Sequence, residues 1–337
     1  MRAALVTPLS GPLAIYGQAS AAALQLWADQ YSGPDPVELE VLDSHPDTNA
    51  AVRRAEQHHP ALLFGPYGSG PTARVAETTT RLIWNHGGAR IRARENVISV
   101  LAPAESYFTG TVDIVSRHDP QLRKVGVLHA DTGFARSVGK GATEAADQRG
   151  LDVHRVVLPE PAPQAELLLI AGRFEDELSV ARALPREPWR AVGLVAAGVR
   201  EILAGLGDLE GLLGPAQWMS PGRSPGSPEP DEGPTADEFA SAYRARTRGE
   251  PPYPAAQAFA AGLIAARCLR EADSSRDEDL HATAQRLDCT TLFGRFRIDA
   301  DGSQIGHQVL TVQWQDGARK VVWPPDLAQS ILRHPRR

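Results

Sequence analysis

Short apolar runs alternate with amphipathic stretches along most of the chain. The first run, Ala3 to Val6, has the length of a buried strand, and a Pro/Gly-rich loop at residues 8–17 follows it. From Gln18 onward the apolar residues recur with the period of a helix, and Trp27 and Tyr31 share one face. The chain therefore opens with a strand, a loop and a helix, an arrangement in which α/β proteins hold small ligands.

The same rhythm of strand, loop and helix recurs up to about residue 206. Strands are expected at residues 3–6, 37–43, 61–64, 82–84, 97–101, 125–129, 153–157, 167–171 and 191–196. Helices are expected from residue 18, at 48–58, from 71, at 104–116, after a loop at 130–134 up to 149, at 175–184 and at 199–206. Asp47 and Thr48 are expected to cap the helix that runs to about residue 58. Repeated units of this kind predict mostly parallel sheets with right-handed crossovers.

The last third of the chain changes its pattern. Residues 220–234 are rich in Pro, Gly and Ser and predict a mobile surface loop, after which Thr235 is expected to cap an amphipathic helix. A long apolar helix is expected at 255–271. Strands are then expected at 292–298, 308–314 and 320–323, with Asp-Gly turns at 301–302 and 316–317. The chain thus ends in hairpin turns and not in further βα units.

Length and charge narrow the class of protein. A chain of 337 residues is suited to two domains. The net charge of −6 gives no electrostatic support for a nucleic-acid or anionic-membrane partner. No apolar run approaches the ~20 residues that a transmembrane helix needs. We therefore expect no nucleic-acid partner and no direct membrane insertion.

The N-terminus and the cysteines leave the compartment open. Met1 and Arg2 lead directly into the first predicted strand, so no signal peptide is visible. We expect an extracytoplasmic protein, at the cell surface or in the periplasm, if a leader was trimmed, and a cytoplasmic protein if Met1 is the native start. Cys268 lies in an apolar helix and Cys289 ends the next helical segment. Sequence spacing alone cannot establish disulfide geometry, so their pairing stays open.

Six motifs in a fixed order carry a resemblance to a known family. They are LSGPLAIYG at 9–17, the strand–helix junction with Asp43, Asp47, Ala50 and Ala51, GPYGSGPT at 65–72, KVGVLHADTGF at 124–134, PYPAAQAFAA at 252–261 and FGRFRIDADG at 293–302. In sequence and spacing, from about residue 3 to 325, the chain resembles the type I periplasmic binding proteins, the branched-chain amino-acid and amide group.

The resemblance implies an α/β protein of two lobes, often called a Venus flytrap. Each lobe has a mostly parallel sheet flanked by helices, and three hinge crossings join them. Lobe 1 is expected at residues 1–117 and 236–305, and lobe 2 at 118–235 and 306–337. A ligand held in the cleft closes the hinge through contacts that it makes with both lobes.

The expected site departs from the family's amino-acid binders. In those members, hydroxyls of lobe 1 hold the carboxylate and an acid of lobe 2 holds the ammonium. Ser69 keeps one hydroxyl beside helix-start amides, whereas Ala89 occupies the second hydroxyl position. The acid position falls near Ala196 and Ala197. A bound ammonium would lack its counter-charge, which is costly in a closed cleft. We therefore expect no binding of ordinary α-amino acids.

Apolar and aromatic side chains make up most of the remaining walls. Arg173 follows Gly172, where the family places a ligand-stacking residue; it can clamp a carboxylate, stack on a ring or lie solvated. Trp84 ends a strand, which favours a core position, and Trp218 is a further wall candidate. An aromatic or acyl carboxylate, or a neutral amide, suits such walls better than a zwitterion. The expected ligand-binding residues are Tyr16, Tyr67, Ser69, Asn85, Gly87, Phe134, Arg173, Phe174, Ala196 and Tyr253.

Other chemistries find little support in the sequence. His58 and His59 have no Cys or acid at metal-ligand spacing, so a solvated helix end suits them better than a metal site. The loop at 65–70 lacks the Lys-Ser/Thr of a Walker motif. Residues 299–302 are too few for an EF-hand loop. No cofactor and no metal are expected.

The sequence therefore predicts a non-catalytic solute-binding protein that delivers a small molecule to an ABC transporter permease. The first alternative is a cytoplasmic ligand sensor of the same fold, similar to the amide sensors, which acts on a regulatory partner; a leader upstream of Met1 would favour transport. A DNA-binding repressor is disfavoured because no helix-turn-helix precedes the first strand. An α/β hydrolase is the alternative from the enzyme class, although no Gly-x-Ser-x-Gly elbow is present.

Overall fold

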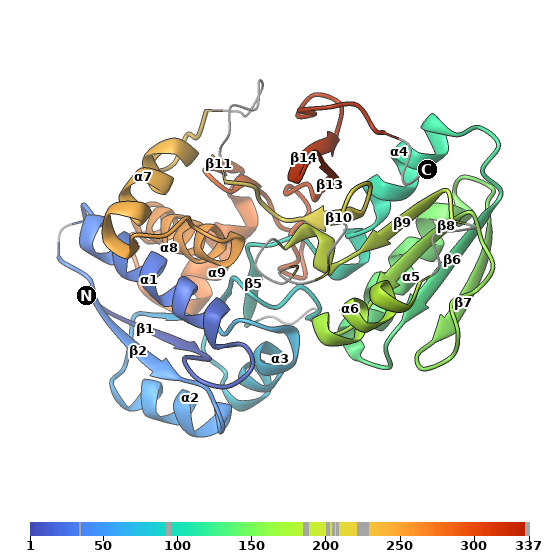
Figure 1. The fold of residues 1–337 in the computed structure, drawn as a ribbon. Helices are drawn as coiled ribbons and strands as arrows, with labels where there is room; N and C mark the ends of the chain where they lie inside the picture. The colour runs from blue at the N-terminus through green and yellow to red at the C-terminus, as the bar shows by residue number, and fades with distance from the viewer. Residues whose placement is uncertain are drawn as a thin grey trace. The chain divides into compact units, whose positions relative to one another are not determined.

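The chain divides into two compact units, each built from separate stretches of sequence (Figure 1). The structure, a computed structural model, describes residues 1–33, 35–91, 96–184, 189–199, 203, 206, 209–220 and 229–333. Among these, unit 1 consists of the residues within 1–103, 218–220 and 229–308, and unit 2 of those within 104–217 and 309–333.

Unit 1 is built on a five-stranded parallel sheet. Its strand order is β2-β1-β3-β4-β5, and Leu5 pairs with Val41 on one side and with Phe64 on the other. The strands are β1 (Arg2–Thr7), β2 (Glu38–Asp43), β3 (Leu62–Phe64), β4 (Ile83–Asn85) and β5 (Val97–Ser99). The expected parallel sheet is thereby confirmed, with strand ends shifted by one or two residues. A separate antiparallel pair consists of β11 (Cys289–Thr291) and β12 (Gly294–Phe296).

Helices cover both faces of this sheet. The helices of unit 1 are α1 (Ala14–Gln30), α2 (Thr48–Gln57), α3 (Ser69–Thr78), α7 (Ala236–Thr247), α8 (Tyr253–Ala272) and α9 (Asp277–Arg286). Apolar residues of α2 and α3 form one cluster with Val6, Leu63 and Ile83 of the sheet. On the other face, Trp27 of α1 packs edge-on against Phe64, with ring centroids 5.6 Å apart. Helices α1 and α8 lie side by side (Figure 1).

Unit 2 has a seven-stranded sheet that is parallel in its larger part. The order is β14-β13-β10-β9-β8-β6-β7, and only the β10–β13 and β13–β14 pairs are antiparallel. The strands are β6 (Lys124–His129), β7 (Asp152–Val157), β8 (Leu167–Ala171), β9 (Ala191–Leu194), β10 (Leu213–Ala216), β13 (Leu310–Gln315) and β14 (Ala318–Trp323). The described helices are α4 (Thr109–His118), α5 (Gly133–Asp147) and α6 (Phe174–Ala183), with 3₁₀ turns η1 (Ala104–Ser106) and η2 (Ala196–Gly198).

Several predicted caps and turns are present in the structure. The Asp47 side chain accepts a hydrogen bond from Ala50 N at the start of α2. Thr235 and Glu238 form a reciprocal capping box at the start of α7. The turn at 316–317 has positive φ at both Asp316 and Gly317, as a tight hairpin requires. Side-chain oxygens and turn residues therefore marked these element ends correctly.

Other predictions need correction. Residues 104–116 do not form one helix, because η1 and α4 are separated by two residues, and residues 104–117 belong to unit 2, where α4 contacts α5, β10, β13 and β14. Cys289 does not end a helix but begins β11. Strand β10 was not predicted. The helix expected at 199–206 and the loop expected at 220–234 lie largely outside the described residues.

No helix in the described part of the chain combines the length and the hydrophobicity that crossing a membrane would require.

Candidate functional site

The candidate site of unit 1 lies at the carboxyl edge of its sheet. Strand β1 leads through its loop to α1, β3 leads to α3, and β4 ends at Asn85. Because the strands are parallel, the residues that follow them share one edge of the sheet. Helix α8 begins near the same edge, since Ser20 of α1 donates a long hydrogen bond to Pro254 O of α8.

Three tyrosines meet at this edge, and we call them the tyrosine cluster: Tyr16, Tyr67 and Tyr253. The Tyr16 and Tyr67 rings stack with centroids 4.8 Å apart. The ring centroid of Tyr253 lies 6.4 Å from that of Tyr16 and 6.3 Å from that of Tyr67. The Tyr253 hydroxyl forms a hydrogen bond with the Tyr67 hydroxyl. Tyr16 and Tyr67 are buried, and Tyr253 is partly exposed. Three residues that the sequence proposed separately are thus brought together.

Gly87 holds Tyr67 in place. A Cβ atom at Gly87 would lie 2.5 Å from Tyr67 Cα, so only glycine allows the loop after β4 to approach the loop after β3 this closely. Gly87 O accepts a hydrogen bond from Gly68 N at 2.9 Å. The Asn85 side chain braces the same loop through Gly87 N, Gly88 N and Gly88 O. Asn85 and Gly87 are therefore placed to position Tyr67, and the Asn85 amide is occupied by its own loop and by Ser99 Oγ of β5.

Ser69 begins α3 beside the tyrosine cluster. Its Oγ accepts a hydrogen bond from Arg90 N at 3.0 Å. Within the described part of the chain its own proton is donated to no acceptor, and Gly68 before it supplies no side-chain cap. A hydroxyl proton and the first amides of a helix are suited to a carboxylate or a carbonyl oxygen.

A buried histidine next to this site was not singled out by the sequence. His86 follows Asn85 and is fully buried, and neither ring nitrogen has a hydrogen-bond partner in the described structure. Burial lowers the pKa of His86 to about 4, so the ring is neutral at pH 7. In the sequence His86 lies in the loop after a predicted strand, where nothing distinguishes it from other loop residues. Only its burial in the structure marks it as unusual.

Phe134 and Tyr107 form a second aromatic pair, in unit 2. Phe134 is the second residue of α5, whose N-cap Thr132 accepts a hydrogen bond from Ala135 N. The Phe134 ring meets the Tyr107 ring edge-on, with centroids 5.5 Å apart. Burial raises the pKa of Tyr107 to about 12, against the effect of a hydrogen bond with Gln217. Tyr107 was not predicted because it lies far from Phe134 in the sequence.

The remaining expected residues of unit 2 gather around α6. Arg173 is exposed and is the N-cap residue of α6. Phe174 is half-buried and packs against the hydrophobic cluster that contains Ala196. The ligand contact expected at Ala196 stays a prediction. Its side chain lies inside that cluster, and its backbone amide donates to Glu177 Oε2.

Glu177 is a buried carboxyl group that the sequence did not single out. Its Oε1 accepts a hydrogen bond from Gly172 N at 2.7 Å, and its Oε2 accepts one from Ala196 N at 2.6 Å. Burial raises the pKa of Glu177 to about 8, and the nearby Asp176 charge adds to this, while the two amide bonds act in the opposite direction. Glu177 therefore places a carboxyl group against the backbone of Ala196, the position at which the sequence shows only alanines.

The other wall candidates are core residues. Trp84 is completely buried, which confirms the core position favoured from the sequence. Trp218 is buried in unit 1, where its Nε1 donates to Leu292 O and its ring lies 6.1 Å from that of Phe239.

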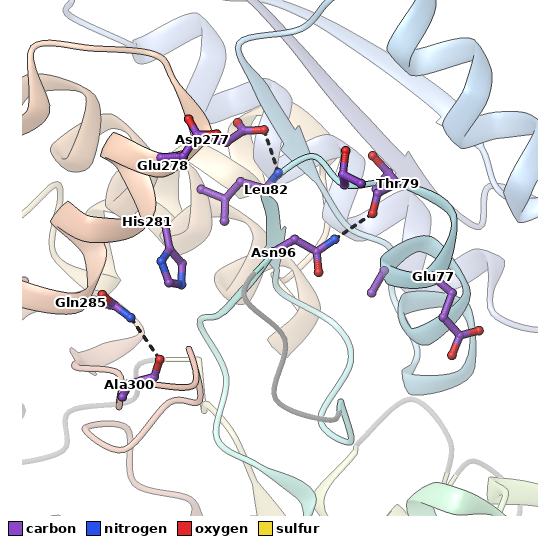
Figure 2. A pocket seen from close by; sticks show the side chains of 11 residues that line it. Glu77, Thr79, Leu82, Asn96, Asp277, Glu278, His281, Gln285 and Ala300 are labelled. Atoms are coloured by element: carbon purple, nitrogen blue, oxygen red, sulfur yellow. Dashed lines mark hydrogen bonds between the residues drawn. The ribbon is translucent and has the colours of Figure 1, made fainter.

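A separate hollow of about 850 Å³ lies at the opposite, amino edge of the unit 1 sheet (Figure 2). Leu82 and Asn96, which line it, directly precede β4 and β5. Asp277 of α9 also lines it, but its carboxylate accepts hydrogen bonds from Arg81 and from Leu82 N. These polar groups brace α9 against the sheet, and none of the expected ligand-binding residues lies here.

Metal and thiol chemistry find no site among the described residues. No group of three or more His, Cys, Asp or Glu side chains in that part of the chain is placed to hold a metal ion. Cys268 and Cys289 are free and buried. Burial raises the pKa of both thiols, to about 12 for Cys289. Buried, protonated thiols are poor nucleophiles.

Comparisons with known proteins agree on one family and one fold. A family model described as periplasmic binding protein matches residues 1–170. The Leu/Ile/Val-binding protein homolog 7 of Brucella abortus is 22% identical over 372 residues, which covers 98% of this chain and 92% of that protein.

Solved structures extend this likeness to the whole chain. A leucine-binding protein from Thermotoga maritima has a TM-score of 0.78 at 16% identity, covering 95% of this chain and 97% of its own. A branched-chain amino-acid transporter substrate-binding protein from Streptococcus pneumoniae, in complex with isoleucine, has a TM-score of 0.76 at 16% identity, with coverages of 96% and 99%. A solute-binding protein from R. palustris, in complex with benzoate, has a TM-score of 0.73 at 14% identity, with coverages of 98% and 97%. The expected fold is confirmed.

Proposed function

We propose that this chain, which belongs to the periplasmic binding protein family, is the substrate-binding component of an ABC importer and binds an aromatic or acyl carboxylate or a neutral amide. It is non-catalytic in this proposal, acts outside the cytoplasm and delivers its ligand to a transporter permease. The relatives reported above include proteins named for branched-chain amino acids and one bound to benzoate. The fold therefore accommodates both ligand classes and does not choose between them.

The tyrosine cluster is the observation that carries the proposal. Stacked rings 4.8 Å apart provide a flat apolar surface, and the hydrogen-bonded Tyr67 and Tyr253 hydroxyls add polarity at one end. A planar ring or an acyl chain packs well on such a surface. The Ser69 hydroxyl and the first amides of α3 supply donors for a carboxylate or a carbonyl oxygen.

The candidate residues supply little charge for an ammonium group. The tyrosine cluster and Ser69 are neutral, and His86 beside them is neutral at pH 7. In unit 2 the Glu177 oxygens are both engaged by backbone amides. An ammonium buried against these residues would lose its hydration without gaining a counter-ion. We therefore propose that ordinary α-amino acids are not the ligands.

A binding screen tests this proposal. We expect benzoate or benzamide to raise the unfolding temperature, and a ligand present at ~100 times its dissociation constant should stabilise the protein by roughly 2.7 kcal/mol. Leucine and isoleucine should give no shift. Micromolar binding of leucine, measured by calorimetry, would refute the ligand class while leaving the family assignment intact.

Two matched variants locate the binding. Tyr253→Phe removes the hydroxyl that bonds Tyr67, and it should weaken benzamide binding by about fivefold to tenfold, the loss of one hydrogen bond. Tyr243→Phe is the control, since Tyr243 is buried beside Phe239 in α7 and lies outside the cluster. Equal losses in both variants would mean that the cluster does not hold the ligand.

The cytoplasmic sensor remains the alternative within the same family. It uses the same site and the same closing motion, but it acts on a regulatory partner instead of a permease. Export decides between them: a lipoprotein or secretory leader in the full reading frame, with recovery of the protein from the cell envelope, supports transport. Recovery from the cytoplasm alone supports the sensor.

A further inference from the structure

Glu177 differs from Asp113, the other buried acid among the described residues of unit 2. Asp113 pairs with Arg117 and Arg149, whereas no cation in the described structure pairs with Glu177. Its side chain is fully buried on the first turn of α6. A lone buried carboxyl group is costly unless hydrogen bonds satisfy its oxygens. Here the partners are two backbone amides, Gly172 N at 2.7 Å and Ala196 N at 2.6 Å. The burial is therefore compensated by bonds to the main chain alone.

These two amides belong to neighbouring loops at the carboxyl edge of the unit 2 sheet. Strands β8 and β9 are adjacent and parallel, with Ile170 paired to Leu194. Gly172 directly follows β8, and Ala196 lies two residues after β9. One carboxyl group thus ties together the two loops that follow these adjacent strands.

Each of these two loops leads into a helical segment that carries expected ligand-binding residues. The first loop carries Arg173 and Phe174 and begins α6, and the second begins η2. Without Glu177 both amides would be buried with no acceptor, which destabilises the loop conformations that bury them. A bond between an amide and a carboxyl oxygen is also directional, so it fixes the loop backbone in orientation as well as in position.

We propose that Glu177 is a positioning residue of the ligand site: by holding Gly172 and Ala196 it fixes the loops with which unit 2 receives the ligand. This inference rests on the proposed function, because the conformation of the two loops matters for recognition only if the protein binds a ligand. Glu177 itself does not touch the ligand, since both of its oxygens are engaged by the backbone.

A pair of variants separates the loss of the Glu177 hydrogen bonds from the effect of a Glu-to-Gln change elsewhere on the same helix. Glu177→Gln keeps the size of the side chain but leaves only one acceptor oxygen. The side-chain NH2 of the glutamine then faces one of the two backbone N–H groups and cannot accept its hydrogen bond. Glu175→Gln is the matched control: Glu175 is exposed on the same turn of the helix and undergoes the same chemical change. Only the first variant disturbs the bonds to Gly172 and Ala196.

Two measurements are made on both variants and on the wild type. Hydrogen exchange of the ligand-free protein should be at least ~10-fold faster at residues 172–174 or 195–197 in Glu177→Gln, and unchanged there in Glu175→Gln. Calorimetry with benzoate as the probe should show binding weakened ~10-fold in Glu177→Gln and by less than about twofold in Glu175→Gln.

The outcomes are distinguishable. Unchanged exchange in Glu177→Gln overturns the inference, and so does faster exchange with unchanged benzoate affinity, because the loops would then be held for stability alone. If the wild type binds neither benzoate nor isoleucine, the proposed function fails and the positioning role falls with it.

A measurement on the wild type covers the case in which Glu177→Gln does not fold. The amide resonances of Gly172 and Ala196 should titrate with one shared midpoint, since one carboxyl group bonds both, and benzoate should move that midpoint. The charged neighbours on α6 are Arg173, Glu175 and Asp176. Separate midpoints, or a midpoint that benzoate leaves unchanged, would contradict the inference.

Discussion

Two buried titratable side chains of this protein are held in opposite ways. His86 has no hydrogen-bond partner in the described structure, and burial lowers its pKa to about 4. Glu177 has two backbone partners, and burial raises its pKa to about 8. Each group is neutral at pH 7 because the uncharged form avoids the cost of desolvation. Their contributions to stability therefore depend on pH with opposite signs.

His86 makes a testable contribution below pH 7. Between pH 6.5 and 4 the unfolded chain protonates this histidine and the folded protein does not, so stability is lost as the pH falls through that range. From pH 7 to pH 5 the loss is about 2 kcal/mol at 1.36 kcal/mol per pKa unit. In His86→Leu this part of the loss should disappear. Urea unfolding at both pH values measures the difference.

The control for this prediction is His154→Gln, which removes an exposed histidine of β7. Its unfolding free energy should depend on pH as in the wild type. If His86→Leu retains the full wild-type loss between pH 7 and pH 5, then His86 is not held neutral by burial.

At the scale of elements, periodicity and capping residues predicted most of the parallel architecture. Strands β1, β6 and β8 were placed within one residue because each is a continuous apolar run. Strand β10 was missed because Gly214 and Pro215 are poor strand formers, and it is held in the sheet by β9 and β13 on either side. Long-range pairing overrides local preference there, and no local pattern reports it.

The contact between α1 and α8 depends on one glycine. A Cβ atom at Gly262 would lie 2.4 Å from the Trp27 ring, which is itself packed against Phe64. Gly262→Ala should therefore lower the free energy of unfolding by about 1–3 kcal/mol through overpacking, although alanine is the better helix former. Denaturant titration measures this change.

Gly249→Ala is the control for the helix contact, since the nearest atom to its added Cβ is Thr247 Oγ1 at 3.9 Å. Its unfolding free energy should stay within about 0.5 kcal/mol of the wild type. An equal or greater stability of Gly262→Ala would show that the two helices can separate without cost.

At the scale of the whole molecule, the candidate site could be predicted only residue by residue. Tyr16, Tyr67 and Tyr253 were each expected to bind ligand, but the contacts of Tyr253 with the other two join residues more than 180 positions apart and follow from the fold. Glu177 escaped prediction for the same reason: its partners lie at the ends of two other strands. Composition and spacing identify residue types, whereas only the packed sheet shows which of them meet.

The proposed function includes closure on the ligand, and this part of the proposal can be tested on the whole protein. A ligand shifts a conformational equilibrium only by its difference in affinity for the two states, so contacts with one unit alone cannot favour a closed state. Saturating benzoate should therefore reduce the radius of gyration in small-angle scattering. Phe134→Ala, a change in unit 2 that leaves the tyrosine cluster intact, should abolish the contraction and weaken binding ~10-fold. Unchanged affinity in that variant, with no contraction in the wild type, would mean that unit 1 holds the ligand alone.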